Sequence, residues 1–151
     1  MKTNQKIKNI LEILRKRHWC IGIMESCTGG AIANAVTNIP GASDVFGLGK
    51  VTYSIKAKIE AGVNEEIIKK YGLYSVETAE EMAKKIEGNV GVGITGNMND
   101  PAEVFVAVRV GNKVESKKLK VESKDKNEFE ARKEKKMKVV ERVVDLIIDN
   151  I

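Results

Sequence analysis

The feature that most constrains the fold is an apolar run that passes abruptly into small polar residues and glycines, and then into a second apolar segment. Residues 20–24 form the first run, residues 25–30 read ESCTGG, and residues 31–39 read AIANAVTNI. This pattern is typical of a buried strand that turns sharply into a closely packed helix. It predicts an α/β fold in which the ESCTGG segment lies at an edge of the sheet.

The rest of the chain alternates helices with strands and then forms a late β-hairpin. Helical spacing and flanking glycines predict helices over residues 3–17, 54–62, 65–71, 76–86 and 127–150. Strand patterns cover residues 45–53, 90–95, 103–110 and 113–121, with a hairpin turn at Gly111-Asn112. We therefore predict one α/β domain over residues 1–151, a three-layer α/β sandwich with a mixed sheet.

The composition favours a folded domain and excludes several classes of protein. Hydrophobic residues make up 42% of the chain, and no stretch approaches the ~18 consecutive apolar residues that a membrane helix needs. Residues 1–19 carry frequent charges and lack the apolar region of a signal peptide, so we expect a cytoplasmic protein without a membrane partner. An aromatic content of 5% and a net charge of only +5 argue against a nucleic-acid partner.

Cysteine and histidine are scarce, which limits the chemistry that the chain can support. Cys20 and Cys27 are too few for a disulfide framework, so both are expected to be free thiols. His18 is the single histidine, and its place after a helical run predicts a position at the surface or at a helix end. The sequence therefore offers no His-rich metal site, and it offers a Ser-His-Asp triad only if His18 itself serves.

The stretch 113–138 contains many lysines, but acids are interspersed among them. We interpret the stretch as a solvated strand edge followed by a solvated helix face, because charged side chains protect edge strands from pairing with other chains. A polyanion site is the alternative interpretation.

The ESCTGG segment carries the most informative candidate chemistry. A turn from a strand into a helix exposes its central side chains, so Ser26, Cys27 and Thr28 are candidate nucleophiles. Backbone N–H groups at such a turn attract negative charge, and Gly29 and Gly30 let the backbone approach a ligand closely. In the structural alternative, Ser or Thr is only a helix cap and the glycines serve only tight packing.

A serine nucleophile needs a base, and with a single histidine the main remaining choice is a lysine. A lysine acts as a base when burial or positive neighbours lower its pKa. Lys50, Lys56 and Lys58 flank Tyr53 in the segment GKVTYSIKAK, where Tyr53 is a candidate proton relay. Each of these lysines also fits an ordinary solvated surface position.

A third candidate segment follows the apolar run VGVGIT and begins with Thr95 and Gly96. The loop 95–101 reads TGNMNDP. Open α/β sheets bind ligands at the carboxyl ends of their strands, which is where this loop is expected to lie. An ordinary turn before the next strand is the alternative.

Together these segments resemble the CinA C-terminal domain family, which includes nicotinamide-nucleotide amidohydrolases of the PncC type. The family's E-S-C-T-G-G signature, followed by a helix and P-G-A-S, is similar to GIMESCTGGAIANAVTNIPGAS. Its V-x-T-Y-S-N-x-x-K-x-x-x-G-V segment is similar to KVTYSIKAKIEAGV, its V-S-x-x-x-A-x-x-M-A helix to SVETAEEMA, and its T-G-I-A-G-P strand and loop to VGVGITG. The resemblance runs from about residue 5 to residue 110 and covers the predicted core of one domain.

The resemblance implies an activity and a set of site residues. The nucleophile falls on Ser26, and Tyr53 and Lys58 manage protons, so the resemblance selects Lys58 from the three lysines. The implied reaction deamidates nicotinamide mononucleotide to nicotinate mononucleotide and ammonia through an acyl-enzyme, without a metal or organic cofactor. Residues implied to bind the substrate are Glu25, Thr28, Gly29, Gly30, Thr95 and Gly96.

The chain departs from the family pattern after Gly96. The family's T-G-I-A-G-P-G-G-G loop and its K-P-V-G element are replaced by the shorter TGNMNDPAEVFVAV, and the F-x-G-D-R segment is echoed only by FEAR, with Phe129 and Arg132. Glycine-rich loops commonly hold phosphate, so this change affects the expected substrate. The alternatives are a divergent CinA-like domain that binds a small ligand or a protein partner, and a Ser-Lys hydrolase of different specificity.

The expected assembly is a homo-oligomer acting on a small-molecule substrate. A wide sheet with a hairpin edge exposes a pairing surface, and symmetric dimers are the commonest assemblies. Because the first predicted helix begins at residue 3, we also expect the stand-alone form of the domain.

Overall fold

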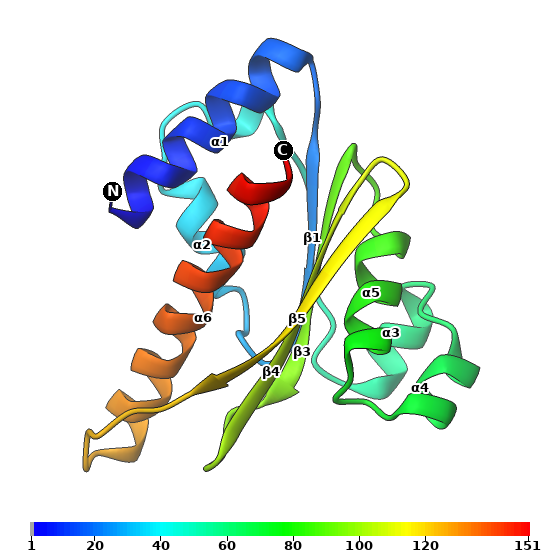
Figure 1. Ribbon diagram of the computed structural model, residues 1–151, viewed down its shortest axis with the longest axis vertical. Coiled ribbons are helices and arrows are strands. Elements are labelled where there is room, and N and C mark those ends of the chain that lie inside the picture. Colours follow the sequence, from blue (N-terminus) through cyan, green and yellow to red (C-terminus); the bar gives the residue numbers. More distant parts are fainter. Residues whose placement is uncertain (1) are drawn as a thin grey trace.

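A five-stranded mixed sheet organises the molecule, with strand order β2-β1-β3-β4-β5. The computed structural model describes residues 2–151 (Figure 1). Three strands are mutually parallel: β1 (Ile21–Glu25), β2 (Phe46–Val51) and β3 (Val90–Asn97). The antiparallel part consists of β4 (Ala102–Val110) and β5 (Lys113–Val121), joined by the predicted hairpin turn.

Helices cover both faces of this sheet, which confirms the predicted three-layer arrangement (Figure 1). One face carries α1 (Thr3–Arg17), α2 (Ala31–Thr37) and the long α6 (Glu128–Asn150). The other face carries α3 (Ile55–Glu60), α4 (Glu65–Tyr71) and α5 (Val76–Lys85). A short 3-10 helix, Ala42–Asp44, leads from α2 towards β2. No helix within residues 2–151 is both long enough and apolar enough to cross a membrane.

The larger core lies between the sheet and the layer of α1, α2 and α6. On α1 the apolar positions that repeat at helical spacing are buried, as the pattern predicts: Ile7, Ile10, Leu11 and Leu14. They meet the apolar face of α6 and the inner face of the sheet in one continuous cluster. Burying an aliphatic side chain of this kind stabilises the fold by about 1.5–3 kcal/mol, so this cluster fixes where α6 lies.

The second helical layer approaches the sheet unusually closely because β3 carries glycines. A Cβ on Gly93 would lie 2.1 Å from the carbonyl oxygen of Ala79, and a Cβ on Gly91 would lie 2.2 Å from that of Ala83. Both carbonyls belong to α5, so the glycine side of the strand admits the helix backbone itself. The glycines of VGVGIT therefore serve helix packing.

The lysine-rich stretch is largely solvated, as expected, but with one exception. β5 is the outer strand of the sheet, and most of its lysines are exposed. On α6, however, Lys135 is only 4% exposed. The interpretation of the whole stretch as a solvated face is therefore wrong at this position, where the side chain is enclosed and hydrogen-bonded instead.

Candidate active site

The candidate site lies where the connections leaving two neighbouring parallel strands diverge. β1 leads into α2 on one face of the sheet, whereas β2 leads into α3 on the other face (Figure 1). Such a switch point leaves a crevice at the carboxyl ends of the strands. Ser26 directly follows β1, and Tyr53 lies two residues beyond the end of β2. The backbone N–H of Thr52 donates to the carbonyl of Glu25 at 2.8 Å. This hydrogen bond holds the segments that follow β1 and β2 side by side.

Ser26 and Lys58 form a buried hydrogen-bonded pair across this crevice. The Nζ of Lys58 donates to the Oγ of Ser26 at 2.9 Å and to the backbone carbonyl of Thr52 at 2.6 Å. Lys58 is fully buried and Ser26 is 6% exposed. Burial lowers the pKa of Lys58 to about 8, because an ammonium loses its hydration there and no carboxylate among residues 2–151 is hydrogen-bonded to it. The arrangement therefore places a hydroxyl group next to an amine that loses its proton more easily than an ordinary lysine does.

The structure distinguishes among the three lysines that the sequence offered as candidate bases. Lys50 and Lys56 are exposed, and the nearest acid to the Nζ of Lys56 is Glu60, one helical turn away at 4.0 Å. Lys58 alone of the three points inward from α3 to Ser26. His18 is exposed at the C-terminal end of α1 and contributes nothing to this crevice.

Glu25 organises the turn between β1 and α2. Its carboxylate is 1% exposed and accepts four hydrogen bonds, from the hydroxyl of Thr28 (2.6 Å) and from the backbone N–H groups of Gly30 (3.0 Å), Ile32 (3.2 Å) and Ala33 (3.0 Å). A carboxylate at the start of a helix satisfies donors that have no partner within the helix. Glu25 therefore acts on the backbone of the turn, and the side chain of Thr28 and the N–H of Gly30 are already engaged.

The two glycines of the turn have backbone conformations that other residues adopt only with strain. Gly29 has φ 61° and Gly30 has φ 102°. The N–H of Gly29 donates to the carbonyl of Ser26 at 2.9 Å, which closes a tight turn directly behind the nucleophile candidate. The TGG part of the signature thus sets the direction in which Ser26 faces.

A cavity of about 180 Å³ opens beside Ser26, and we call it the catalytic cavity. Tyr53 is 61% exposed and lies at its edge, and no hydrogen bond within residues 2–151 joins its hydroxyl to Ser26 or Lys58. Gly96 lines the cavity, whereas the hydroxyl of Thr95 is buried and donates to the carbonyl of Leu73 at 3.1 Å. The full lining is Ser26, Cys27, Tyr53, Leu73, Tyr74, Gly96, Asn97, Met98, Asn99 and Arg132.

Cys27 is less suited than Ser26 to act as the nucleophile. Its side chain is 5% exposed, and burial raises the pKa of the thiol to about 12. The reactive form of cysteine is the thiolate, which is scarce near neutral pH at such a pKa. In the described part of the chain, no lysine, arginine or histidine is hydrogen-bonded to the thiol, whereas Ser26 has Lys58 as its direct partner.

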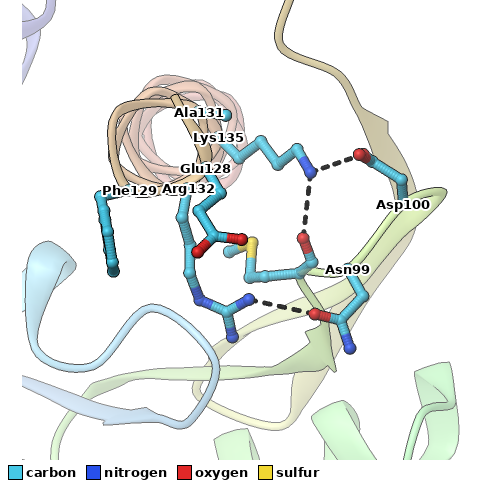
Figure 2. A pocket seen from close by; sticks show the side chains of 8 residues that line it. Asn99, Asp100, Glu128, Phe129, Ala131, Arg132 and Lys135 are labelled. Atoms are coloured by element: carbon cyan, nitrogen blue, oxygen red, sulfur yellow. Dashed lines mark hydrogen bonds and ion pairs between the residues drawn. The ribbon is translucent and has the colours of Figure 1, made fainter. Parts of the chain in front are cut away.

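Two cations of α6, which the sequence analysis does not include among its site residues, lie beside the turn. Arg132 lines the catalytic cavity, and its Nη1 donates to the Oδ1 of Asn99 at 3.2 Å (Figure 2). A Cβ on Gly29 would lie 3.4 Å from the Nζ of Lys136. Their spacing of one helical turn places both side chains on one face of α6. In the sequence, the FEAR segment points to Arg132, whereas Lys136 is indicated only by its spacing from Arg132, which the many surrounding charges hide.

Metal ligands do not gather anywhere in the part of the chain that the structure describes. Among residues 2–151, no three side chains of His, Cys, Asp or Glu are placed to hold one ion.

The fold and the site define a class: an open α/β sheet that carries a buried serine–lysine pair at the carboxyl ends of its parallel strands. The sequence model of the CinA C-terminal domain matches residues 3–147. The chain thus belongs to the CinA C-terminal domain family, as the sequence motifs predict.

Similar proteins agree with this assignment. A CinA-like protein of Chloroherpeton thalassium is 48% identical over 94 residues, which cover 59% of this chain and 22% of that protein. A putative competence-damage inducible protein of Thermoanaerobacter pseudethanolicus is 37% identical over 123 residues, or 73% of this chain and 30% of that protein. The chain thus spans less than a third of these two relatives.

The similarity extends to solved structures. The crystal structure of the competence/damage inducible protein CihA from Agrobacterium tumefaciens superposes with a TM-score of 0.85 at 26% identity, covering 97% of this chain and 94% of that chain. The similarity therefore includes the final helix, α6, beyond the segment in which the sequence motifs are recognisable.

Proposed function

We propose that this domain is an amidohydrolase that removes the amide nitrogen of nicotinamide mononucleotide as ammonia, through a serine–lysine covalent mechanism. The observation that carries the proposal is the 2.9 Å hydrogen bond between the Nζ of Lys58 and the Oγ of Ser26, with both groups buried beside a cavity. A nucleophile within hydrogen-bond reach of a base is the recurring arrangement of covalent amidases. The resemblance to amidohydrolases of the same family supports the choice of substrate.

Acylation begins with neutral Lys58. The amine takes the proton of Ser26 while the Oγ attacks the carboxamide carbon, so that a C–O bond forms and the carbonyl becomes an oxyanion. The resulting ammonium then gives its proton to the amide nitrogen as the C–N bond breaks, and ammonia leaves. Lys58 is neutral again at the end of this step, because the proton it took has left with the product.

The oxyanion needs donors that the fold has not already used. The N–H groups of Gly30, Ile32 and Ala33 are bonded to Glu25, and that of Gly29 to Ser26. The backbone N–H groups of Cys27 and Thr28 are not among these bonds, and they directly follow the nucleophile. We assign them as the oxyanion donors, a role in which fixed backbone dipoles are effective because they need no reorganisation.

Deacylation uses the same two side chains. Water attacks the ester carbon while Lys58 accepts its proton, and the C–O bond to Ser26 breaks as Lys58 returns the proton to the Oγ. The products are the free serine and the carboxylic acid, which loses its proton to solvent and leaves as the carboxylate of nicotinate mononucleotide. Burial of Lys58 serves both halves of the reaction, since each needs an amine that gains and loses a proton near neutral pH.

The remaining groups of the cavity fit the other parts of the proposed substrate. Tyr53 and Tyr74 are both more than half exposed at the cavity edge, and aromatic rings attract a flat cation such as the pyridinium ring. Arg132 lines the cavity from α6, Lys136 of the same helix lies beside Gly29, and both cations suit a phosphate. These two cations could thus bind the phosphate in place of the glycine-rich loop that this chain lacks.

The test is ammonia release from nicotinamide mononucleotide by the purified protein. Ser26→Ala and Lys58→Met are each expected to lower kcat by at least about 10³-fold, because each removes one half of the unit that breaks the amide. Lys56→Met is the matched control, since it removes an exposed lysine from the same helix, and it should retain wild-type turnover.

Two results would overturn the proposal in different ways. Full activity in Ser26→Ala or in Lys58→Met would exclude the serine–lysine mechanism. No ammonia from well-folded wild-type protein would exclude this substrate, and a screen of other small amides would then separate a hydrolase of different specificity from a domain that only binds a ligand or partner.

A further inference from the structure

A second, larger cavity adjoins the catalytic cavity. It has a volume of about 420 Å³ and lies between the loop after β3 and the first turns of α6 (Figure 2). Met98, Asn99 and Arg132 line both cavities. We call Met98 and Asn99 the partition, because they follow β3 and line both spaces. The other residues that line the second cavity are Asp100, Glu128, Phe129, Ala131 and Lys135.

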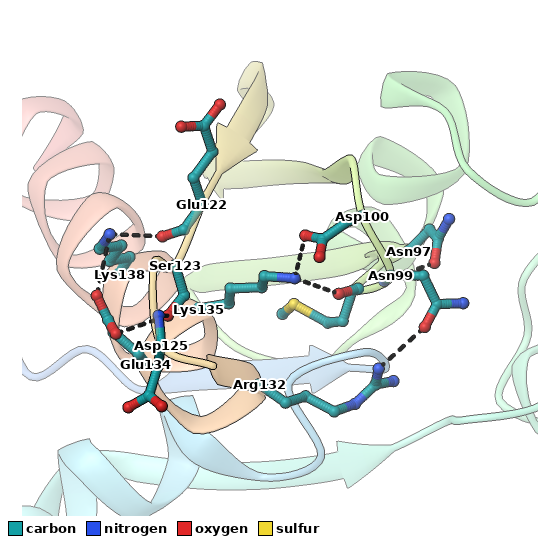
Figure 3. Close-up of polar contacts among 11 residues, drawn as sticks. Asn97, Asn99, Asp100, Glu122, Ser123, Asp125, Arg132, Glu134, Lys135 and Lys138 are labelled. Carbon is teal, nitrogen blue, oxygen red and sulfur yellow. Dashed lines mark hydrogen bonds and ion pairs between the residues drawn. The ribbon is translucent and has the colours of Figure 1, made fainter. Parts of the chain in front are cut away.

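The partition is fastened to α6 by two side chains. The Nζ of Lys135 donates to the carbonyl of Met98 at 3.1 Å and to the Oδ1 of Asp100 at 2.6 Å, and Arg132 donates to the Oδ1 of Asn99 (Figure 3). Within the loop, the N–H of Asn99 also donates to the Oδ1 of Asn97 at 2.9 Å. The hydrogen bonds from α6 therefore fall on the partition itself and on the residue that follows it.

Lys135 differs from the other lysines of its helix. Its side chain is 5% exposed, whereas the side chain of its ion-pair partner Asp100 is 83% exposed. Enclosing an ammonium is costly unless its donors are satisfied, and here the carbonyl of Met98 and the carboxylate of Asp100 supply that compensation. Lys138, one turn further along α6, is 45% exposed and bonds to the carbonyl of Glu122 and to Glu134, away from the partition (Figure 3).

We propose that Lys135 is a positioning residue that sets the length of substrate admitted to the catalytic cavity. By holding Met98 and Asp100 against α6, it keeps the partition in place and the two cavities separate. Without this fastening, the catalytic cavity opens into the larger space and accommodates a group attached beyond the substrate's phosphate, such as the second nucleotide of a dinucleotide. This inference rests on the proposed function for its substrate, but its geometry does not depend on that function.

The first experiment compares kcat/KM for nicotinamide mononucleotide and nicotinamide adenine dinucleotide. In wild-type protein the mononucleotide is preferred, and Lys135→Met is expected to lower that preference at least about tenfold. The change should appear mainly in KM, because Ser26 and Lys58 belong to other elements. Lys138→Met, the matched control on the same helix, should keep the wild-type preference. An unchanged preference in folded Lys135→Met overturns the proposal.

A second experiment works without turnover. Cys27 lines the catalytic cavity, so in a Cys20→Ser background the rates of its modification by methyl methanethiosulfonate and by fluorescein maleimide report how large a molecule can enter. Both rates are measured at alkaline pH, because burial raises the pKa of this thiol and the thiolate is the reactive form. Lys135→Met should raise the rate with the bulky reagent relative to the small one, and Lys138→Met should not. An unchanged ratio in folded Lys135→Met overturns the proposal.

These two experiments separate the possible failures. If wild-type protein turns over neither nucleotide, the proposed function fails, and the reagent ratio still decides the role of Lys135. If Lys135→Met does not fold, Asp100→Asn replaces it, because this substitution removes an exposed carboxylate from the same contact and leaves the core intact. It should shift both measurements in the same direction by a smaller factor, and no shift in either measurement would contradict the proposal.

Discussion

At the scale of single residues, the protonation of Lys58 decides what the site can do. The amine is fully buried, and its hydrogen-bond acceptors are a hydroxyl and a backbone carbonyl, neither of which carries a full negative charge. An ammonium in such surroundings loses hydration without gaining an ion pair. The neutral amine is therefore accessible near neutral pH, and the neutral amine is the form that can accept the proton of Ser26.

The activity should consequently rise with pH. Burial lowers the pKa of Lys58 to about 8, so the base is mostly protonated and inactive below this value and mostly neutral and active above it. We expect kcat/KM for nicotinamide mononucleotide to increase through about pH 8 and then to level off, since this parameter follows the ionisation of the free enzyme. A profile that is flat between about pH 6.5 and 9.5 would exclude Lys58 as the base.

Residue patterns alone do not distinguish Lys58 from its neighbours. Lys50, Lys56 and Lys58 lie in one short segment, and each fits a solvated position when it is considered by itself. Lys50 is exposed on the outer strand β2, and the packing of α3 against the sheet, a tertiary property, buries Lys58 and exposes Lys56. The family resemblance selects Lys58 because it carries information about that tertiary arrangement.

At the scale of elements, the short helix α2 depends on a residue outside it. Helices of seven residues are unstable alone, because few hydrogen bonds repay the cost of nucleation. Glu25 compensates by accepting N–H groups from the first turn of α2 while belonging to β1. These three hydrogen bonds and the one from the hydroxyl of Thr28 fix the turn that presents Ser26, so the stability of α2 and the geometry of the site have one origin.

Replacing Glu25 by glutamine should therefore destabilise the protein. The substitution removes one acceptor oxygen and places an NH₂ group among donors, and buried groups without partners cost about 1–3 kcal/mol each. We expect Glu25→Gln to lower the free energy of unfolding by about 2 kcal/mol in urea denaturation, and Glu12→Gln, at an exposed position on α1, to leave it nearly unchanged. Equal stability of the two variants would show that Glu25 does not anchor α2.

The final helix shows where element patterns reach their limit. Its length follows from the spacing of its apolar residues, and the structure confirms that Val140, Val143, Val144 and Ile147 are buried. Met137, which the same spacing places on this face, is 53% exposed, so the prediction is wrong at that position. Its polar face, in contrast, looks uniform in the sequence, although Lys135 is enclosed and Arg132 lines the catalytic cavity. Charged side chains on a helix are distinguished only by what packs against them, and here that is a loop far away in the sequence.

At the scale of the whole molecule, the topology assembles the site from distant segments. The turn after β1, the segment from Thr52 to Lys58, the loop after β3 and the first turns of α6 meet at the carboxyl ends of the parallel strands. The alternation of strands and helices predicts this edge as the place for a site. The second cavity could not be predicted, because it depends on how the short loop after β3 packs against α6.

The central claim is that Ser26, activated by Lys58, forms a covalent bond with the substrate. The most direct test mixes excess protein with nicotinamide mononucleotide, stops the reaction with acid within the first turnover, and identifies any acylated peptide by mass spectrometry. The account predicts a transient acyl group on Ser26 that is absent from Ser26→Ala. Release of ammonia without any adduct during this turnover, or an adduct on Cys27 instead, would contradict it.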